Sequence, residues 1–177
     1  MGYTVPLTAV SNTALTASQW NASMRDNMLE TPAAKFTVAS QLFVSTGANA
    51  GAVRVPSMGV VATLETTAST TYTDLATAGP NSGGIITGPK ALVGLHCYSN
   101  HASTGVPALM SFAVSGASTI AAADAFAIGM EGPNGCRVGS LQMIDTLTPG
   151  NNTFTAKYRT ISGTATFQAR RISVIPL

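Results

Sequence analysis

The chain has 177 residues, a mass of 18.0 kDa and a formal net charge of +2, and 45% of its residues are hydrophobic. This length and hydrophobic content predict a folded domain with room for an appendage, and they argue against wholesale disorder. Only 9% of the residues are charged, and no cluster of Lys and Arg is present that would neutralise a run of phosphates, so we expect no binding to nucleic acid. A surface this poor in charge is typical of a protein that functions in an assembly.

The N-terminal sequence MGYTVPLTAV lacks the basic and the long apolar stretches of a secretory signal. No apolar run in the chain approaches the roughly 20 residues that a membrane-spanning helix needs. We therefore expect a protein that is made in a cytoplasm and has no membrane partner.

Residues 1–35 predict a polar arm followed by one short helix. Thr16 and Gln19 have the spacing of a capping box, in which the two side chains satisfy the first backbone amides of a helix. Thr31 and Pro32 end the helix, because the residue before a proline avoids the helical conformation. The result is a helix of about a dozen residues, a length that is only marginally stable in water on its own.

An apolar stripe runs along this predicted helix. Trp20, Met24 and Met28 recur at intervals of four residues, which places them on one side, whereas Arg25 lies off the stripe. Because a polar arm has no core of its own, we expect the stripe to dock on another surface. The alternative is that the helix folds back on the β domain of its own chain.

Residues 36–57 hold two apolar runs on either side of Gly47, Asn49 and Gly51, so they predict a β-hairpin or an extended connector. Residues 58–177 predict a β-sandwich or jelly-roll domain of about eight short strands separated by breaks rich in Gly, Pro and Asn. The pattern does not choose between these topologies. The predicted strands are 58–66, 70–75, 90–99, 107–116, 124–130, 137–145, 152–160 and 165–177, with a helical turn as the alternative for 121–126.

Alternation within these strands predicts which side chains point inwards. Phe154, Ala156 and Tyr158 share one face of their strand, and the adjacent Arg170 and Arg171 point to opposite faces of another. The methionines at 110, 130 and 143 are typical of core filling.

The sequence contains no nucleotide-binding loop, serine-hydrolase elbow or zinc-protease motif, and its seven acidic residues are scattered. We therefore expect no enzymatic activity, no catalytic residues and no cofactor. His96, Cys97 and His101 are the cluster that most resembles a zinc site. His96 and Cys97 are neighbours on a strand and face opposite ways, so we expect hydrogen-bonded histidines instead. The alternative is a metal site in which a trimer brings three copies of one His together on its symmetry axis. Cys97 and Cys136 are expected to be buried thiols, and a disulfide between them is also left open.

Four short segments near the N-terminus resemble a stretch that recurs in structural proteins of tailed bacteriophages infecting actinobacteria. They are LTA at 15–17, WN at 20–21, RDN at 25–27 and ETPAAK at 30–35. Residues 64–80, 109–119, 147–159 and 164–177 also look like repeated elements of virion surface and fibre modules.

The resemblance implies a homotrimeric protein that decorates the capsid or forms a short head fibre, located on the capsid surface and assembled in the host cytoplasm. It also implies that residues 1–35 attach the protein to the major capsid protein, another virion protein or a neighbouring subunit, with Trp20, Met24, Arg25 and Met28 as the contacts. The alternatives are a tail or baseplate protein that contacts the host, and a carbohydrate-binding module. Whether the outer surface binds a host glycan stays open.

Overall fold

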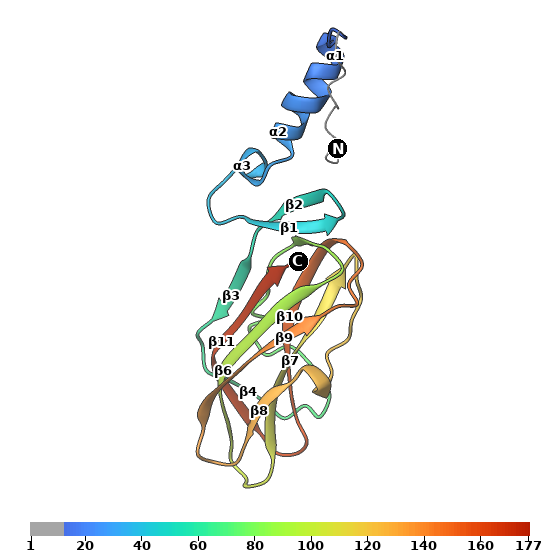
Figure 1. The fold of residues 1–177 in the computed structure, drawn as a ribbon. Helices are drawn as coiled ribbons and strands as arrows, with labels where there is room; N and C mark the ends of the chain where they lie inside the picture. Colours follow the sequence, from blue (N-terminus) through green and yellow to red (C-terminus); the bar gives the residue numbers. More distant parts are fainter. Residues whose placement is uncertain (1–12) are drawn as a thin grey trace. The chain divides into compact units, whose positions relative to one another are not determined.

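The computed structural model describes residues 13–177, and the chain divides between Val55 and Pro56 into two compact units. The first unit contains α1 (Ala17–Trp20), the π-helical segment η1 (Asn21–Asp26), α2 (Asn27–Leu29), α3 (Pro32–Lys35), β1 (Leu42–Gly47) and β2 (Ala50–Arg54), as drawn in Figure 1. The second contains β3 (Ser57–Val61), β4 (Glu65–Thr67), β5 (Ile85–Thr87), β6 (Ala91–His101), β7 (Pro107–Gly116), the 3₁₀ turn η2 (Asp124–Phe126), β8 (Ile128–Glu131), β9 (Cys136–Ile144), β10 (Gly150–Thr160) and β11 (Ala165–Pro176).

The predicted helix and its capping box are confirmed. The Gln19 amide donates to Thr16 Oγ1 at 3.2 Å, and the Thr16 amide donates to Gln19 Oε1 at 3.0 Å. Helical turns continue through η1 to Leu29, and Pro32 then begins the separate four-residue helix α3, which the sequence did not predict. A proline fits this first helical position because its missing amide would have had no helical partner. The first twelve residues of the predicted arm lie outside the described residues.

Within residues 36–57, β1 and β2 form a hairpin, one of the two predicted alternatives, and Ser57 already begins β3 of the second unit. β1 and β2 pair antiparallel from Leu42 opposite Arg54 to Gly47 opposite Ala50. Asn49 in the turn has a φ of 54°, a left-handed conformation that asparagine tolerates better than most residues.

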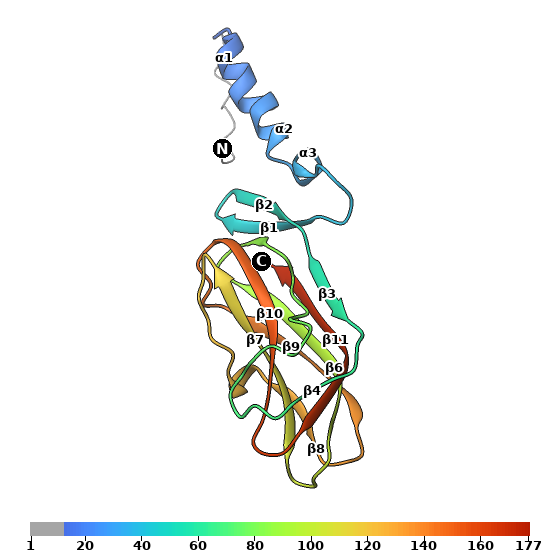
Figure 2. The same ribbon diagram turned by 180° about the vertical axis from the view of Figure 1, so that it is seen from behind.

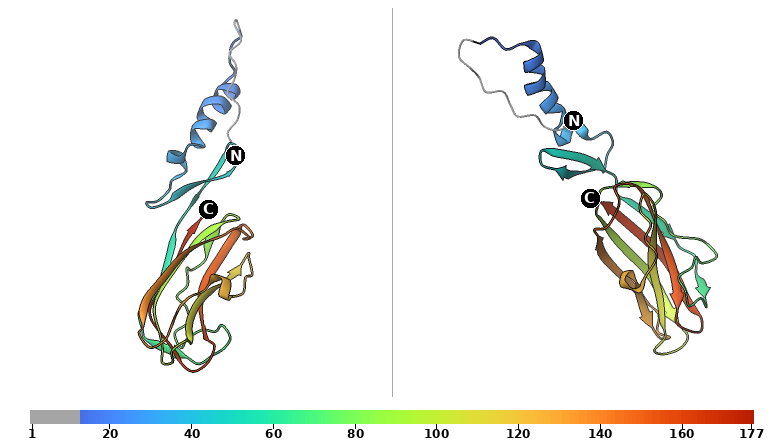
Figure 3. Two further views of the ribbon diagram at one scale, coloured as in Figure 1. Left: turned by 60° about the horizontal axis from the view of Figure 1, so that its bottom comes forward. Right: turned by 90° about the vertical axis from the view of Figure 1, so that its right-hand side faces the viewer.

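The second unit is a β-sandwich of two antiparallel sheets, as the sequence predicted for its fold class. One sheet has the order β5-β10-β7-β8, and the other has the order β3-β11-β6-β9 with β4 also paired to β11. Figures 1 and 2 show these strands from opposite sides, and Figure 3 gives two further views. Phe154, Ala156 and Tyr158 are fully buried between the sheets, which confirms the predicted inward face of β10.

Some predicted strands differ from the observed ones. Residues 58–66 form two strands, β3 and β4, and the short strand β5 was missed. Residues 70–75 were wrongly predicted as a strand, since Thr73 makes only an isolated bridge to Tyr158 on β10. Local alternation gives no information about whether a neighbouring strand is available along the whole run. The helical turn kept as an alternative at 121–126 is present as η2.

The predicted core methionines are only partly confirmed. Met110 is fully buried, whereas Met143 is 56% exposed. Met143 lies opposite Leu92 on the outer face of the five-stranded sheet, so its strand turns it away from the core.

A bulge in β11 separates the two adjacent arginines. The pairing with β6 shifts between Gln168 and Arg171, and Ala169 within the shift has a φ of 50°. Arg170 is fully buried and Arg171 is exposed, so the prediction that they face opposite ways is confirmed.

Candidate functional site

All four predicted contact residues of the N-terminal helix lie on its solvent-exposed surface. Trp20 is 54% exposed, Met24 45% and Met28 65%. The side chain of Arg25 is 63% exposed, and its Nε donates to Asp26 Oδ1 at 3.0 Å. The three apolar side chains therefore have much of their surface available for a further contact.

Between residues 13 and 55 the structure buries no hydrophobic side chain, and Asn27 is the only buried residue there. A two-stranded hairpin and short helical segments are marginal in water unless an apolar face packs against something. The exposed large apolar side chains of this unit are Leu15, Trp20, Met24, Met28, Leu29, Phe36, Val38, Leu42, Phe43 and Val55. The first unit thus has apolar surface in abundance and no core of its own within the described residues.

The contacts inside the first unit are polar or shallow. Lys35 Nζ lies 2.7 Å from Glu30 Oε2, and this hydrogen bond lowers the pKa of the Glu30 carboxyl. A depression of about 440 Å³ in this unit is lined by residues 30–32 and by the hairpin, including Phe43 and Gly51. The ring of Phe43 covers Gly51 so closely that a Cβ at that position would collide with it.

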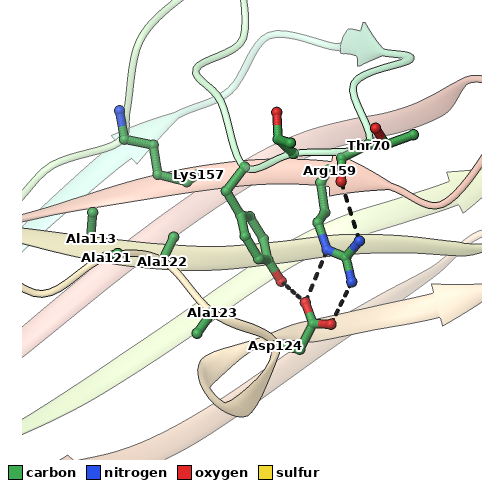
Figure 4. A pocket seen from close by; sticks show the side chains of 10 residues that line it. Thr70, Ala113, Ala121, Ala122, Ala123, Asp124, Lys157 and Arg159 are labelled. Atoms are coloured by element: carbon green, nitrogen blue, oxygen red, sulfur yellow. Dashed lines mark hydrogen bonds and ion pairs between the residues drawn. The ribbon is translucent and has the colours of Figure 1, made fainter.

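The larger depression, of about 650 Å³, lies on the β-sandwich at the outer face of β10 (Figure 4). Arg159 forms a two-pronged ion pair with Asp124, with Nε at 2.9 Å from Oδ1 and Nη2 on Oδ2. Tyr72 donates its hydroxyl to Asp124 Oδ1 at 2.8 Å, and Arg159 Nη1 donates to the Thr70 carbonyl at 3.3 Å. Ala113 and residues 121–123 supply a small apolar lining.

The electrostatics of this depression are those of a structural clamp. The Arg159 guanidinium lowers the pKa of Asp124, and burial together with the Asp124 bond raises the pKa of Tyr72 to about 12. Lys157, which also lines the depression, is held by Asp74 at 2.7 Å. Each of these charges is paired with a neighbour of opposite sign. The cluster ties residues 70–74 and 121–124 to β10.

A second ionic cluster lies inside the sandwich, where Arg170 is fully buried. Its Nη2 is 3.1 Å from Glu65 Oε2 and 3.1 Å from Thr63 Oγ1, and its guanidinium carbon lies 5.4 Å from the centre of the Tyr158 ring. The Thr77 amide also donates to the Glu65 carboxylate, and this bond and the Arg170 charge lower the pKa of Glu65. The sequence indicated that one of the two adjacent arginines would face the core, because neighbours on a strand point to opposite faces. It gave no indication that Glu65 would be the partner of that arginine.

The expectation of hydrogen-bonded histidines is confirmed for His101 and is wrong for His96, whose Nδ1 is buried without a hydrogen-bond partner. His96 lies on the outer face of its sheet and Cys97 is buried on the inner face, so the two do not form one site. His101 is buried, and its Nε2 bonds the Ser162 carbonyl at 2.8 Å while its Nδ1 bonds the Ser103 amide at 2.9 Å. Across residues 13–177, no three His, Cys, Asp or Glu side chains are grouped so as to hold a metal ion.

The expectation of two buried thiols is wrong for Cys136, which is exposed near the start of β9. Cys97 is buried, and its burial raises the pKa of its thiol to about 12. Both cysteines are free in the structure. The edge position of β9 explains the difference, because a residue at the end of an edge strand is covered from one side at most.

None of the helices between residues 13 and 177 combines the length and the apolar character that crossing a bilayer requires. A scan of the sequence against protein-family models gives no match, and no curated protein has a similar sequence. Among solved structures, the chain is similar to the C-terminal CBM6 of LamC, a laminarinase of the marine organism Zobellia galactanivorans, at 14% identity. That match covers 76% of this chain and 88% of the other, with a TM-score of 0.26. A match at this similarity assigns no function to the chain.

Proposed function

We propose that this chain is a structural protein of a tailed-bacteriophage virion, a homotrimer that decorates the capsid or forms a short head fibre. Residues 1–35 attach it to the major capsid protein or another virion protein, with Trp20, Met24, Arg25 and Met28 as contacts. The proposal includes no catalytic activity and no cofactor. The observation that supports it is that the N-terminal unit buries no apolar side chain between residues 13 and 55, whereas the β-sandwich of the same chain has a core of its own.

The free energy of such an attachment fits an assembly of several copies. Burying a large apolar side chain fully contributes about 1.5–3 kcal/mol, and Trp20, Met24 and Met28 are each about half exposed. One arm therefore gains a few kcal/mol and has to offset the ordering of its own backbone. Three arms on one trimer raise the effective concentration of each other, so that weak contacts add up to a stable attachment.

The experiment is to replace the three apolar side chains by Ala together, in the full-length chain, and to measure incorporation into phage particles. The proposal expects a folded protein that no longer co-purifies with particles. A matched control replaces Leu64 and Ile161, which are 57% and 50% exposed on the other unit, and should be incorporated normally. Normal incorporation of the helix variant would refute the proposal.

The single tryptophan supplies a second measurement. Trp20 is more than half exposed in the free chain, so its fluorescence should shift to shorter wavelength when the chain joins particles. An unchanged spectrum in assembled particles would place the contact elsewhere. Electron micrographs of labelled particles then separate a capsid location from the tail or baseplate alternative.

The carbohydrate-binding alternative makes a different expectation. Sugar platforms use exposed aromatic rings, and no aromatic residue between 56 and 177 is exposed. A glycan array with the full-length chain should give no binding. Selective binding that is lost when Tyr72 is replaced would favour a sugar site in the Asp124 depression instead.

A further inference from the structure

The two outer faces of the β-sandwich differ in character. The outer face of the four-stranded sheet carries Lys157 and Arg159, which are paired to acids, and Ser111, whose hydroxyl donates to the Ala123 carbonyl at 2.8 Å. Polar groups and nearby chain segments therefore already occupy that face. Within residues 13–177, no ion pair involves the side chains on the outer face of the five-stranded sheet.

The strand register defines what the outer face of the five-stranded sheet carries. Residues directly opposite each other in an antiparallel pair point to the same side of the sheet. Three successive rows across β3, β11, β6 and β9 point outwards: Ile175, Leu92 and Met143; Met58, Ser173, Gly94 and Leu141; Val60, Arg171, His96 and Gly139. We call these eleven residues the outer patch.

Large apolar side chains dominate the outer patch. Met58 is 62% exposed, Val60 48%, Leu141 65% and Met143 56%. Arg171 is the only residue of the patch with a permanent charge, and the patch contains no acid. Gly94 and Gly139 leave a hollow of about 450 Å³ at its centre, beside the knob formed by Leu141. Contiguous apolar patches of this kind mark interaction sites on soluble domains.

The size of the outer patch indicates a partner as broad as a sheet. Four strands spaced about 4.8 Å apart and three rows about 7 Å apart cover roughly 400 Å² in projection. A stable protein interface buries roughly 800 Å² of accessible surface per partner, so the residues around the rim of the patch would have to take part as well. A single peptide strand would cover one row and leave the others in water.

The near absence of charge in the outer patch indicates which class of partner it binds. Binding of a nucleic acid would require several Lys or Arg side chains in the patch. An acidic peptide would find only one permanent positive charge there, that of Arg171. A flat surface of uncharged apolar rows packs best against the same surface of other copies of this chain. Such faces can meet in threes about a three-fold axis, as the proposed homotrimer requires. The long side chain of Arg171 can lay its methylenes on the apolar surface and keep its guanidinium in water at the rim.

We infer that the outer patch is the interface through which copies of this chain associate, with a second copy as its occupant. This inference deepens the proposed function, because it names the surface that holds the homo-oligomer together. It concerns association in solution and not attachment to particles, so the two can fail separately.

The test compares the full-length chain with the double variant Leu141→Asp, Met143→Asp by light scattering coupled to size exclusion across a dilution series. Both side chains are more than half exposed within the subunit, so the variant should fold, which the melting temperature checks. The unchanged chain should have a multiple of the 18.0 kDa monomer mass, and the variant should weaken association by more than about 30-fold, the effect of losing an interface hot spot.

The matched control is Ile86→Asp on β5 of the other sheet. Ile86 is 56% exposed, the same as Met143, but it lies outside the outer patch. This variant should associate like the unchanged chain. A monomeric unchanged chain at its highest soluble concentration, or a double variant that keeps the full oligomer mass, would overturn the inference. Neither result would bear on whether the N-terminal helix attaches to particles.

Discussion

Replacing Glu65 by Gln tests the ion pair between Glu65, whose side chain is 14% exposed, and the fully buried Arg170. The substitution keeps the size of the side chain and an oxygen that can accept the Thr77 amide, but it removes the charge 3.1 Å from Arg170. The charge of Arg170 would then have no neutralising partner, and water could not replace the lost carboxylate because the Arg170 side chain has no contact with solvent. Removing one partner of a buried ion pair destabilises a protein by about 3–5 kcal/mol.

The bonds that remain around Arg170 place the effect at the lower end of this range. Its Nη2 still reaches Thr63 Oγ1 at 3.1 Å, and its guanidinium still lies over the Tyr158 ring. We therefore expect a loss of about 3 kcal/mol in the free energy of unfolding. For a chain of this size that corresponds to a fall of about 6–12 °C in Tm.

The assay is urea and thermal unfolding followed by circular dichroism, with Asp74→Asn as the matched control. Asp74 also pairs with a cation, Lys157 at 2.7 Å, but its side chain is 41% exposed and that of Lys157 is 24% exposed. A surface pair of this kind contributes about 0–1 kcal/mol. If Glu65→Gln and Asp74→Asn destabilise the chain equally, the buried pair does not have the role that its geometry indicates.

Two further predictions concern titration and thiol chemistry. The folded pKa of Glu65 lies below its usual 4.5, so its contribution to stability is complete above that value and is lost as the pH falls through the lower folded pKa. Urea unfolding at a series of pH values should show this loss of stability, and Glu65→Gln should make its dependence on pH shallower. The same dependence on pH in the variant would contradict the assignment to Glu65. Cys136 is exposed and Cys97 is buried with a pKa of about 12, so a thiol reagent should modify one cysteine of the native chain and both in denaturant. Two fast-reacting thiols in the native chain, or none, would contradict this.

Much of the β-sandwich could be predicted from local pattern. The alternation that placed Phe154, Ala156 and Tyr158 on one face is a property of the extended backbone alone, so it survives whatever packs against it. The same holds for the capping box at Thr16, which closes within one turn of helix. The runs that failed were those where pairing depended on a distant segment, as at residues 70–75.

The candidate sites were predictable to a different degree. The stripe of Trp20, Met24 and Met28 was predicted from its regular spacing, and the structure exposes all three side chains. Their role as contacts to a partner stays a prediction. The clusters around Asp124 and Glu65 were missed, because each joins residues that lie far apart in sequence and share no motif. Met143 was assigned to the core because its residue type says nothing about which face of its strand meets the second sheet.

The sequence by itself determined the capped helix, the β class of the larger unit and the alternation of its strands, and it left residues 36–57 as a hairpin or an extended connector. Tertiary structure alone decided which face of each sheet is covered, which acid neutralises the buried Arg170 and where Met143 ends up. The physical reason is that alternation fixes which side chains share a face, while the identity of the buried face depends on where the rest of the chain packs.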